Sequence, residues 1–429
     1  MIIGFLATAV LVVVLIHLYL WKRLVRDTIR PGRWRRVAGL AVLVGGLLVP
    51  ATLVGTRAGA GWLAWPGFIW LALMFYLLVS LLVLEIPMLV ARLLLRRRAR
   101  RATPAVPVSS GVPGDVSLAG VAAGPRNGAA KAAVAEQAPP VLAEPSVPAE
   151  PPVPGAVPRR VVLSRGAAIM AGLAATGTVG YGVRTAMGPP RLNRVQIPLA
   201  KLPRSMDGLR VALVSDIHLG PLAGRAHTER IVEKINSLDA DLVTVVGDLV
   251  DGTVAELGPA AEPLGALRSR RGAFFVTGNH EYYSGAAEWV EEVGRLGLRV
   301  LRNERVEIAG LDLAGVNDAT GGEQGDPPDY DRALAGRDPS RPVVLMAHQP
   351  VQAHEAARRG VDLQLSGHTH GGQLAPFNLL VKLQQPVVSG LGRVDGMPVF
   401  VTNGAGFWGP PVRVGAPPQV TLVELRSTR

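Results

Sequence analysis

The chain divides into two parts that differ in their pattern of hydrophobic positions. Three long, almost continuously apolar runs lie in the first hundred residues, at Ile2–Trp21, Val37–Val54 and Trp62–Val90. Each approaches or exceeds the roughly 20 apolar residues that a helix needs to cross a bilayer. From about Ile197 onwards, short apolar runs instead alternate with amphipathic, helix-like stretches. The pattern therefore predicts a membrane-spanning region followed by a globular domain.

Two of the apolar stretches allow more than one interpretation. Ile2–Trp21 is expected to span the membrane rather than to be a cleaved signal peptide, because no basic segment precedes it and no small-residue cleavage site follows it. A fourth apolar stretch, Gly166–Val183, follows the paired arginines Arg159 and Arg160. This arrangement resembles a twin-arginine export signal or a signal anchor. A fourth spanning helix with a basic cytoplasmic flank and a soluble helix are the alternatives.

The segment 102–158 has a different composition from its neighbours. It is rich in Ala, Pro, Val and Gly and contains no aromatic residue. Such a segment cannot bury enough apolar surface to offset its ordering entropy, so a disordered linker is predicted. The predicted organisation is 1–101, a transmembrane region of three helices; 102–158, the linker; 159–184, the fourth transmembrane helix or signal anchor; and 196–429, the globular domain.

Positive charge is concentrated beside the apolar runs. The chain has 45 Lys and Arg against 33 Asp and Glu, a formal net charge of +12. Many of these arginines lie in 22–36 and 92–101, as expected for the cytoplasmic flanks of membrane helices. This placement argues against a nucleic-acid partner and predicts a multi-pass protein of the cell membrane. The loop after the second run carries only Arg57, so it is expected outside, and a spanning fourth helix would place the residues after Arg184 outside the cytoplasm.

The C-terminal half alternates between strand-like and helix-like segments. Strands are expected at Arg210–Ser215, Leu242–Val246, Ala273–Thr277, Val343–Met346, Leu363–Ser366, Val399–Thr402 and Val420–Leu425. Helices are expected at Glu229–Leu238, Glu256–Arg268, Ala286–Leu296 and near Gln352–Arg359. This alternation predicts α/β layers with helices outside a sheet. In such folds, ligands gather at the carboxyl ends of the strands.

Five short polar segments fall at those strand ends. They are Ser215–His218, Gly247–Asp251, Gly278–Glu281, Ala347–Gln349 and Gly367–His370. Each segment alone carries little information, but together they supply Asp, Asn and His in the density that two metal ions require. The chain contains no cysteine, so any metal must be held by nitrogen and oxygen ligands.

The residue types suggest separate roles. Asp216 and His218 lie two residues apart, so on an extended chain both would point to one side and bind one cation. Asp248 can bridge two cations, which repel each other unless they share an anionic ligand. His348, His368 and His370 each follow a strand, and neutral imidazoles suit Zn, Fe and Mn.

Asn279 and His280 are adjacent, so their side chains are expected to diverge. The amide oxygen of Asn279 can bind a metal without adding charge. His280, held by Asp251, is then the candidate general acid that protonates a leaving oxygen. Glu281 could orient the loop or serve as an ordinary turn residue, and the sequence favours neither.

The ordered motifs Asp-x-His, Gly-Asp-x-x-Asp, Gly-Asn-His-Glu, His and Gly-His-x-His resemble those of the calcineurin-like metallophosphoesterase superfamily, in particular its membrane-anchored bacterial branch. The resemblance covers about Val211 to Leu425. It implies a four-layer α/β/β/α sandwich, preceded here by the transmembrane helices, with two divalent metal ions at one edge. It implies one metal on Asp216, His218, Asp248 and His370, the other on Asp248, Asn279, His348 and His368, and His280 with Asp251 as the acid pair.

The function implied is hydrolysis of phosphoric ester or pyrophosphate bonds. Two cations lower the pKa of a bridging water, and the resulting hydroxide attacks phosphorus. A tethered site near a bilayer suggests lipid-linked phosphate or pyrophosphate substrates, such as those of the UDP-diacylglucosamine type. Hydrolysis of soluble phosphodiesters or phosphomonoesters and a non-catalytic sensor of phosphorylated ligands are the alternatives. A nuclease is disfavoured because the C-terminal half carries mixed charge.

Arg413 lies in a Pro- and Gly-rich tail, 403–413, that is also similar to that branch. It is a candidate contact for a substrate phosphate oxygen, and a plain surface arginine is the alternative.

Overall fold

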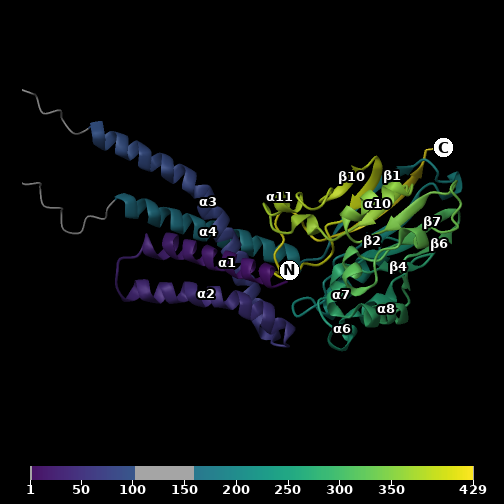
Figure 1. Ribbon diagram of the computed structural model, residues 1–429, viewed down its shortest axis with the longest axis horizontal. Helices are drawn as coiled ribbons and strands as arrows, with labels where there is room; N and C mark the ends of the chain where they lie inside the picture. The colour runs from purple at the N-terminus through teal and green to yellow at the C-terminus, as the bar shows by residue number, and fades with distance from the viewer. Residues whose placement is uncertain (1, 102–158, 429) are drawn as a thin grey trace, which may run out of the picture.

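The structure, a computed structural model, describes residues 2–101 and 159–428. The predicted linker, 102–158, lies outside the described residues. Long helices extend from one end of an α/β part that contains both sheets (Figure 1). The two parts are continuous, since the last long helix leads directly into the first strand.

The N-terminal part consists of four long helical segments. These are α1 (Ile2–Leu20), continued by a π-helical turn at Trp21–Arg26, then α2 (Arg33–Arg57), α3 (Ala64–Arg101) and α4 (Arg159–Met187). Within the described residues, four stretches are long and apolar enough to cross a membrane: Ala7–Arg26, Arg33–Arg57, Gly61–Ala91 and Val161–Met187. Each overlaps one of the apolar stretches identified in the sequence. Many large apolar side chains on these helices are exposed, as lipid-facing residues are.

One ion pair joins two of these helical segments. The Glu85 carboxylate lies 2.8 Å from Arg23 Nε and accepts a hydrogen bond of 2.9 Å from the hydroxyl of Tyr19. Arg23 is buried, and an unpaired charge at this position would be costly. The pairing therefore connects α3 to the end of α1.

The α/β part contains two six-stranded sheets. The first has the order β1-β12-β2-β3-β4-β5, and the second has the order β10-β11-β9-β8-β7-β6. The first sheet comprises β1 (Arg191–Leu199), β2 (Leu209–Val214), β3 (Leu242–Val246), β4 (Ala273–Val276), β5 (Arg299–Val300) and β12 (Gln419–Ser427). The second comprises β6 (Glu304–Ile308), β7 (Leu311–Gly315), β8 (Val343–Met346), β9 (Leu363–Ser366), β10 (Gly390–Val394) and β11 (Met397–Val401). Strands β2 to β5 run parallel, as do β7, β8, β9 and β11.

Three hydrophobic clusters define four layers. The central cluster joins the facing sides of the two sheets, for example Leu213 of β2 and Leu365 of β9. An outer cluster packs Ile231 of α5 and Trp289 of α8 on the first sheet. A third packs α9 and α10 on the second sheet, through side chains such as Ala356. The helices are α5 (Arg225–Asn236), α6 (Val254–Ala261), α7 (Asn279–Ser284), α8 (Ala286–Arg295), α9 (Tyr330–Ala333), α10 (Ala353–Arg358) and α11 (Asn378–Val381).

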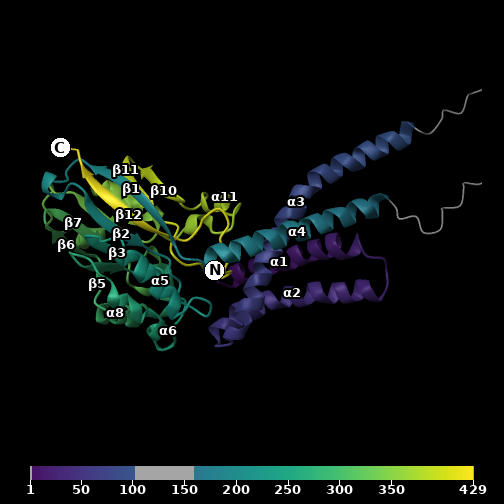
Figure 2. The ribbon, with the colours of Figure 1, turned by 180° about the vertical axis from the view of Figure 1, so that it is seen from behind.

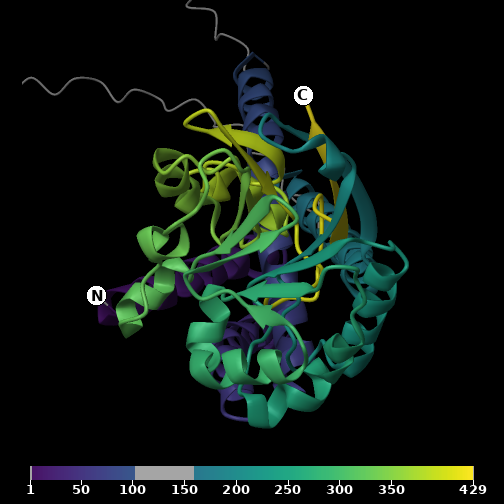
Figure 3. The same cartoon turned by 90° about the vertical axis from the view of Figure 1, so that its right-hand side faces the viewer.

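The predicted α/β/β/α sandwich is thereby confirmed, with helices visible on the outside of the strands (Figure 3). The sequence did not predict β1, β5, β6, β7 or β10. Only two of the nine residues of β1 are buried, and the strand carries several polar residues. Its pairing with β12 joins positions more than 200 residues apart. Neither feature produces a local hydrophobic pattern that would reveal a strand.

The α/β part contacts the ends of two long helices directly. Val412 packs with Ala72 of α3 and with Ala175 and Val179 of α4. The backbone nitrogen of Arg413 donates a 3.0 Å hydrogen bond to the carbonyl of Gly182 in α4. The two parts therefore share a packed, hydrogen-bonded contact.

The central core yields a prediction about stability. Leu365 is completely buried between the sheets, and its replacement by alanine should lower the free energy of unfolding by about 2–5 kcal/mol. Leu391, which is 49% exposed on β10, is a matched control, and Leu391→Ala should change it by less than about 0.5 kcal/mol. Denaturant unfolding of the purified chain in detergent measures both. Equal effects of the two substitutions would contradict the assigned core.

Candidate metal centre

The five polar segments found in the sequence converge at one edge of the sandwich. In the first sheet they follow β2, β3 and β4, and in the second sheet they follow β8 and β9. Both sheets contribute parallel strands to this edge. The carboxyl ends of those strands therefore bring together side chains that lie more than 150 positions apart in the chain.

The backbone at this edge is unusual. Asp216, His218, Asp248, His368 and His370 all have φ between 49° and 69°. This left-handed conformation is uncommon for residues other than glycine, and where it occurs in a fold it tends to mark functional sites. The side chains of Asp216 and His218 converge, as predicted. The prediction assumed an extended chain, whereas both residues are in the left-handed conformation.

Glycines allow the polar segments to approach one another closely. A Cβ atom at Gly367 would collide with the side chains of Ser215 and Asp216. A Cβ atom at Gly406 would collide with the carbonyl of Ile217. The loop after β9 and the C-terminal tail therefore press directly against the loop after β2.

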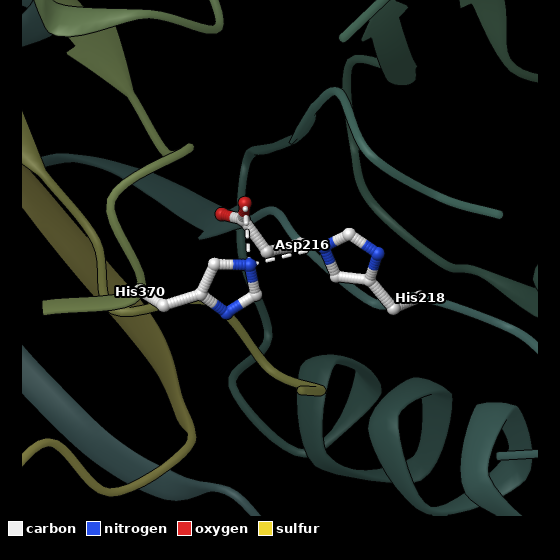
Figure 4. Close-up of side chains that lie close together, drawn as sticks. All are labelled: Asp216, His218 and His370. Atoms are coloured by element: carbon white, nitrogen blue, oxygen red, sulfur yellow. Dashed lines mark hydrogen bonds and ion pairs between the residues drawn. The ribbon is translucent and has the colours of Figure 1, made fainter. Parts of the chain in front are cut away.

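A first cluster consists of Asp216, His218 and His370 (Figure 4). The Nε2 atom of His370 lies 3.4 Å from Asp216 Oδ1 and 3.0 Å from His218 Nε2. All three residues are buried. The Asp216 carboxylate also accepts hydrogen bonds from the backbone nitrogen of His368, at 3.0 and 3.1 Å, and from the hydroxyl of Ser215.

A second cluster consists of Asp248, His348 and His368. His348 donates through Nδ1 to the carbonyl of Val246 at 2.8 Å, and its Nε2 faces Asp248. That Nε2 atom lies 3.1 Å from Asp248 Oδ2 yet is buried without a hydrogen bond of acceptable geometry. Nδ1 of His368 is 3.0 Å from the amide oxygen of Asn279, which places Asn279 beside this cluster.

Asp248 belongs to the second cluster and also approaches the first. Its Oδ2 atom is 3.1 Å from Nε2 of His348 in the second cluster and 3.7 Å from Nε2 of His218 in the first. Its Oδ1 atom accepts a 2.9 Å hydrogen bond from the backbone nitrogen of His280. One carboxylate therefore faces imidazoles of both clusters.

Asp251 contacts two histidines, where the sequence argument assigned it one. Its Oδ1 atom is 2.6 Å from Nδ1 of His280 and 3.0 Å from Nδ1 of His218. Burial lowers the pKa of His280, but the charge of Asp248 and the bond to Asp251 outweigh it and raise this pKa to about 9. Burial raises the pKa of Asp251, but the two histidines lower it to about 2. The pair is therefore a protonated imidazole held by a carboxylate at neutral pH.

The remaining imidazoles differ in charge. Burial lowers the pKa of His348, but the charge of Asp248 outweighs it and raises this pKa well above its ordinary range. His368 and His370 are held in the neutral form. Burial, reinforced by the charge of His348, lowers the pKa of His368 to about 3. Burial and the neighbouring Arg413 guanidinium lower the pKa of His370 well below its ordinary range. Neutral imidazole is the form that binds metal ions.

Glu281 is a structural anchor for the Asp248 loop. It is completely buried in the first turn of α7. Its carboxylate accepts hydrogen bonds from the backbone nitrogens of Asp248 at 3.0 Å, Leu249 at 2.7 Å and Gly278 at 2.6 Å. The structure thus resolves the alternative that the sequence left open, in favour of an orienting role.

Arg413 does not face the open side of the clusters, contrary to the expected phosphate contact. Its side chain is completely buried. The guanidinium donates to the carbonyls of Gly406 at 2.9 Å, His370 at 2.8 Å and Ala416 at 3.3 Å, and lies 3.0 Å from Nδ1 of His370. These bonds occupy its donors, so Arg413 supports the loop that carries His370.

Two exposed aromatic residues near the clusters were not identified from the sequence. The Trp408 and Tyr283 rings lie 5.8 and 5.5 Å from the His280 ring, edge to face. Their exposed fractions are 53% and 63%. The only signal in the sequence was the position of Tyr283 just after the Gly-Asn-His-Glu segment, while Trp408 is brought in by the C-terminal tail.

The donor set fits divalent cations. It offers imidazole nitrogens, carboxylate oxygens and one amide oxygen, which suit Mn, Fe and Zn. The buried Nε2 of His348 has no hydrogen-bond partner, as expected of an atom that binds a metal ion. His370 is the exception, because its Nδ1 faces the guanidinium of Arg413 rather than an acceptor.

The fold and these clusters define a class: two-sheet α/β proteins with candidate metal ligands at the carboxyl ends of their strands. Residues 209–372 match the family model for calcineurin-like phosphoesterases. A protein of Helicobacter pylori strain J99, described as an uncharacterized metallophosphoesterase, is 38% identical over 256 residues, which cover 59% of this chain and 68% of that protein. The chain belongs to the calcineurin-like phosphoesterase family, as its motifs predicted.

Two vertebrate relatives carry a description that also mentions the membrane. A "transmembrane protein with metallophosphoesterase domain" of Danio rerio is 41% identical over 261 residues, covering 58% of this chain and 60% of that protein. The protein of Bos taurus with the same description is 39% identical over 263 residues, covering 57% and 59%. The match thus spans about three fifths of each vertebrate relative. These descriptions agree with the four apolar helices in indicating a membrane protein.

The role of Glu281 can be tested by Glu281→Gln. An amide nitrogen in place of one oxygen would face backbone N–H groups that now donate to it. Leaving such buried groups unpaired costs about 1–3 kcal/mol each, so the free energy of unfolding should fall by at least that amount. Glu288→Gln, on the exposed side of α8, is the matched control. A loss no larger than that of the control would remove the anchoring role.

Proposed function

We propose that this protein is a phosphoester hydrolase that uses two divalent metal ions. The observation that carries the proposal is the position of Asp248, whose Oδ2 atom lies 3.7 Å from Nε2 of His218 and 3.1 Å from Nε2 of His348. A shared carboxylate is what two adjacent cations require, because it offsets their repulsion. Membership of the calcineurin-like phosphoesterase family supports the same conclusion.

The two clusters indicate how the ligands divide. One ion would be held by Asp216, His218, Asp248 and His370, and the other by Asp248, Asn279, His348 and His368. When bound, such ions supply the Lewis acidity that activates water and polarises phosphoryl oxygens. The residues of the chain position those ions through contacts around them, such as the bond from His348 Nδ1 to Val246.

His280 is the proposed general acid. Its ring borders both Asp248 and Asp251, and its raised pKa keeps it protonated at neutral pH. Its Nδ1 proton is bound to Asp251, so Nε2–H is the donor that remains for a leaving-group oxygen. The hydrogen bond to Asp251 fixes the ring orientation while the proton is transferred.

The proposed substrates are phosphorylated molecules close to a membrane, including lipid-linked phosphates or pyrophosphates. The contact of the α/β part with α3 and α4 supports this choice, because it holds the clusters near the ends of the apolar helices. Soluble phosphodiesters or phosphomonoesters are the second candidate, favoured by the partial exposure of His280 and His368. A sensor without catalysis would retain binding but lack turnover.

We also propose a multi-pass arrangement in which α1 to α4 span the membrane. The four apolar stretches and the arginines of 22–36 support it. The even number of spans then returns the chain to the side on which it began, and the basic first loop places the α/β part, 196–429, outside the cytoplasm.

The catalytic proposal is tested with the purified full chain and a chromogenic phosphodiester. Activity should require added Mn²⁺ or a similar divalent ion and be abolished by a chelator. His280→Ala should lower kcat by about 10²–10⁴-fold, the range typical of a lost general acid. His354→Ala is the matched control, because His354 is exposed and pairs with Asp395 instead of the clusters.

Metal content provides a readout that is independent of turnover. Elemental analysis should find about two ions per chain, and Asp248→Asn should reduce this number, while His280→Ala should leave it unchanged. A metal-loaded chain with no activity on a broad panel of phosphoesters would support the sensor instead. A chain that retains no metal would contradict the proposal.

The orientation is tested by labelling in intact cells. The chain has no cysteine, so Ala309→Cys introduces a single thiol at an exposed position in the turn after β6. A membrane-impermeant maleimide should label it without permeabilisation. Labelling only after the cells are lysed would place the α/β part in the cytoplasm.

A further inference from the structure

An exposed apolar loop lies in the chain between His370 and strand β10. Leu379 and Leu380 lie in the short helix α11, and Phe377 and Leu383 flank it; the exposed fractions of Phe377, Leu379, Leu380 and Leu383 are 46%, 59%, 57% and 84%. We call these four residues the apolar loop. An exposed group of large apolar side chains on a folded domain usually marks an interaction surface.

The apolar loop is tied to the contact with the long helices. Leu374, just before it, packs in the same cluster as Val412, Ala175 and Val179. The backbone nitrogen of Ala375 donates a 3.0 Å hydrogen bond to the carbonyl of Val414. The apolar loop therefore begins beside the segment 412–414, which contacts α4.

Two arginines of α4 indicate where the membrane surfaces would lie along this helix. Arg165 and Arg184 are 19 positions apart, which in a helix is about 28 Å, close to the thickness of a bilayer hydrocarbon core. If these arginines mark the two membrane surfaces, Gly182 lies at the surface on the side of the α/β part. The segment bonded to Gly182 is that of Arg413, next to Val414.

The views of the whole chain place α11 at the same level. Figures 1 and 2 both show α11 level with the end of α4 that joins the α/β part, along the long axis of the molecule, rather than at the far end of the sheets. The high exposure of its leucines shows that the described helices do not cover them. With Arg165 and Arg184 at the two membrane surfaces, the loop thus lies at the level of the bilayer surface.

We propose that the apolar loop inserts into the bilayer surface beside α4. Its four apolar side chains would enter the interface, and Lys382, which is also exposed, would remain among the lipid phosphates. The proposal rests on the membrane-spanning arrangement proposed above, and it does not depend on hydrolysis. A lipid surface is favoured as the occupant because the apolar loop continues the contact with the apolar helices.

This contact would orient the candidate metal centre towards lipid headgroups. Trp408 lies 5.8 Å from the His280 ring, and the next residue, Gly409, lies against Phe68 near the start of α3. Tryptophan is enriched at membrane surfaces. The centre would thus lie within reach of phosphate groups carried by lipids, which makes a phosphorylated lipid headgroup the favoured substrate class.

The insertion is tested by depth-dependent quenching. The variants Leu380→Cys and Leu383→Cys, each with a single thiol, are labelled with an environment-sensitive fluorophore and reconstituted as full chains in phospholipid nanodiscs. Lipids that carry a nitroxide near the glycerol backbone should quench both labels by more than half. The matched control, Ala309→Cys, lies in the turn after β6 and should be quenched by less than a tenth.

Two results would overturn the proposal. Quenching at positions 380 and 383 no greater than at 309 would show that the loop stays in water. A blue-shifted but unquenched label would show that protein covers the loop, and energy transfer between differently labelled chains would identify a second copy as the occupant.

A second measurement links the loop to substrate choice. In the triple variant, Leu379, Leu380 and Leu383 are replaced by serine. Two values of kcat/KM are measured, one for a phospholipid phosphoester in vesicles and one for a soluble chromogenic phosphodiester. The ratio of the first value to the second should fall by tenfold or more. Leu391→Ser is the matched control and should leave the ratio unchanged. Quenching without a change in this ratio would remove the substrate inference and leave the membrane contact. Absence of quenching at positions 380 and 383 would contradict both the membrane contact and the substrate inference. Absence of any turnover would contradict only the hydrolase proposal.

Discussion

The candidate centre depends on one carboxylate, that of Asp248, held between two sets of imidazoles. Several features of the fold fix its position. Asp248 follows β3 in a left-handed conformation, and its backbone nitrogen is bound by Glu281. Gly278, at the end of the adjacent strand β4, has no side chain and so leaves room for the carboxylate. Because β3 and β4 are parallel neighbours, the Asp248 and His280 loops reach the edge together.

Burial of this many polar groups would be costly unless nearly all of them were bonded. Most of the hydrogen-bond partners of these buried side chains are backbone groups. Asp216 accepts from the nitrogen of His368, and His348 donates to the carbonyl of Val246. These bonds fix ring orientations before any ligand binds, which is the preorganisation that metal sites and catalytic sites share. The Nε2 atom of His348 that remains without a hydrogen bond points to a metal ion as its missing partner.

The sequence predicted the residues at the strand ends better than it predicted what supports them. Strands β3 and β8 coincide with the predicted ranges, since each is a short apolar run bounded by polar residues. Local pattern cannot reveal that Glu281 is buried or that Asp251 contacts His218 as well as His280, because both depend on the approach of separate strands. Strand β1 was missed for the same reason, as its pairing with β12 is decided by distant residues. The left-handed residues were also invisible, since Asp and His are only moderately favourable there.

Arg413 shows how the membrane part and the candidate centre are connected. Its backbone nitrogen is bonded to Gly182 of α4, and its guanidinium is bonded to the carbonyl of His370. A Cβ atom at Gly182 would collide with Val412, so only glycine lets the tail approach the helix this closely. The position of one candidate metal ligand is therefore set partly by α4. The contact between the α/β part and α4 thus also supports the loop that carries His370.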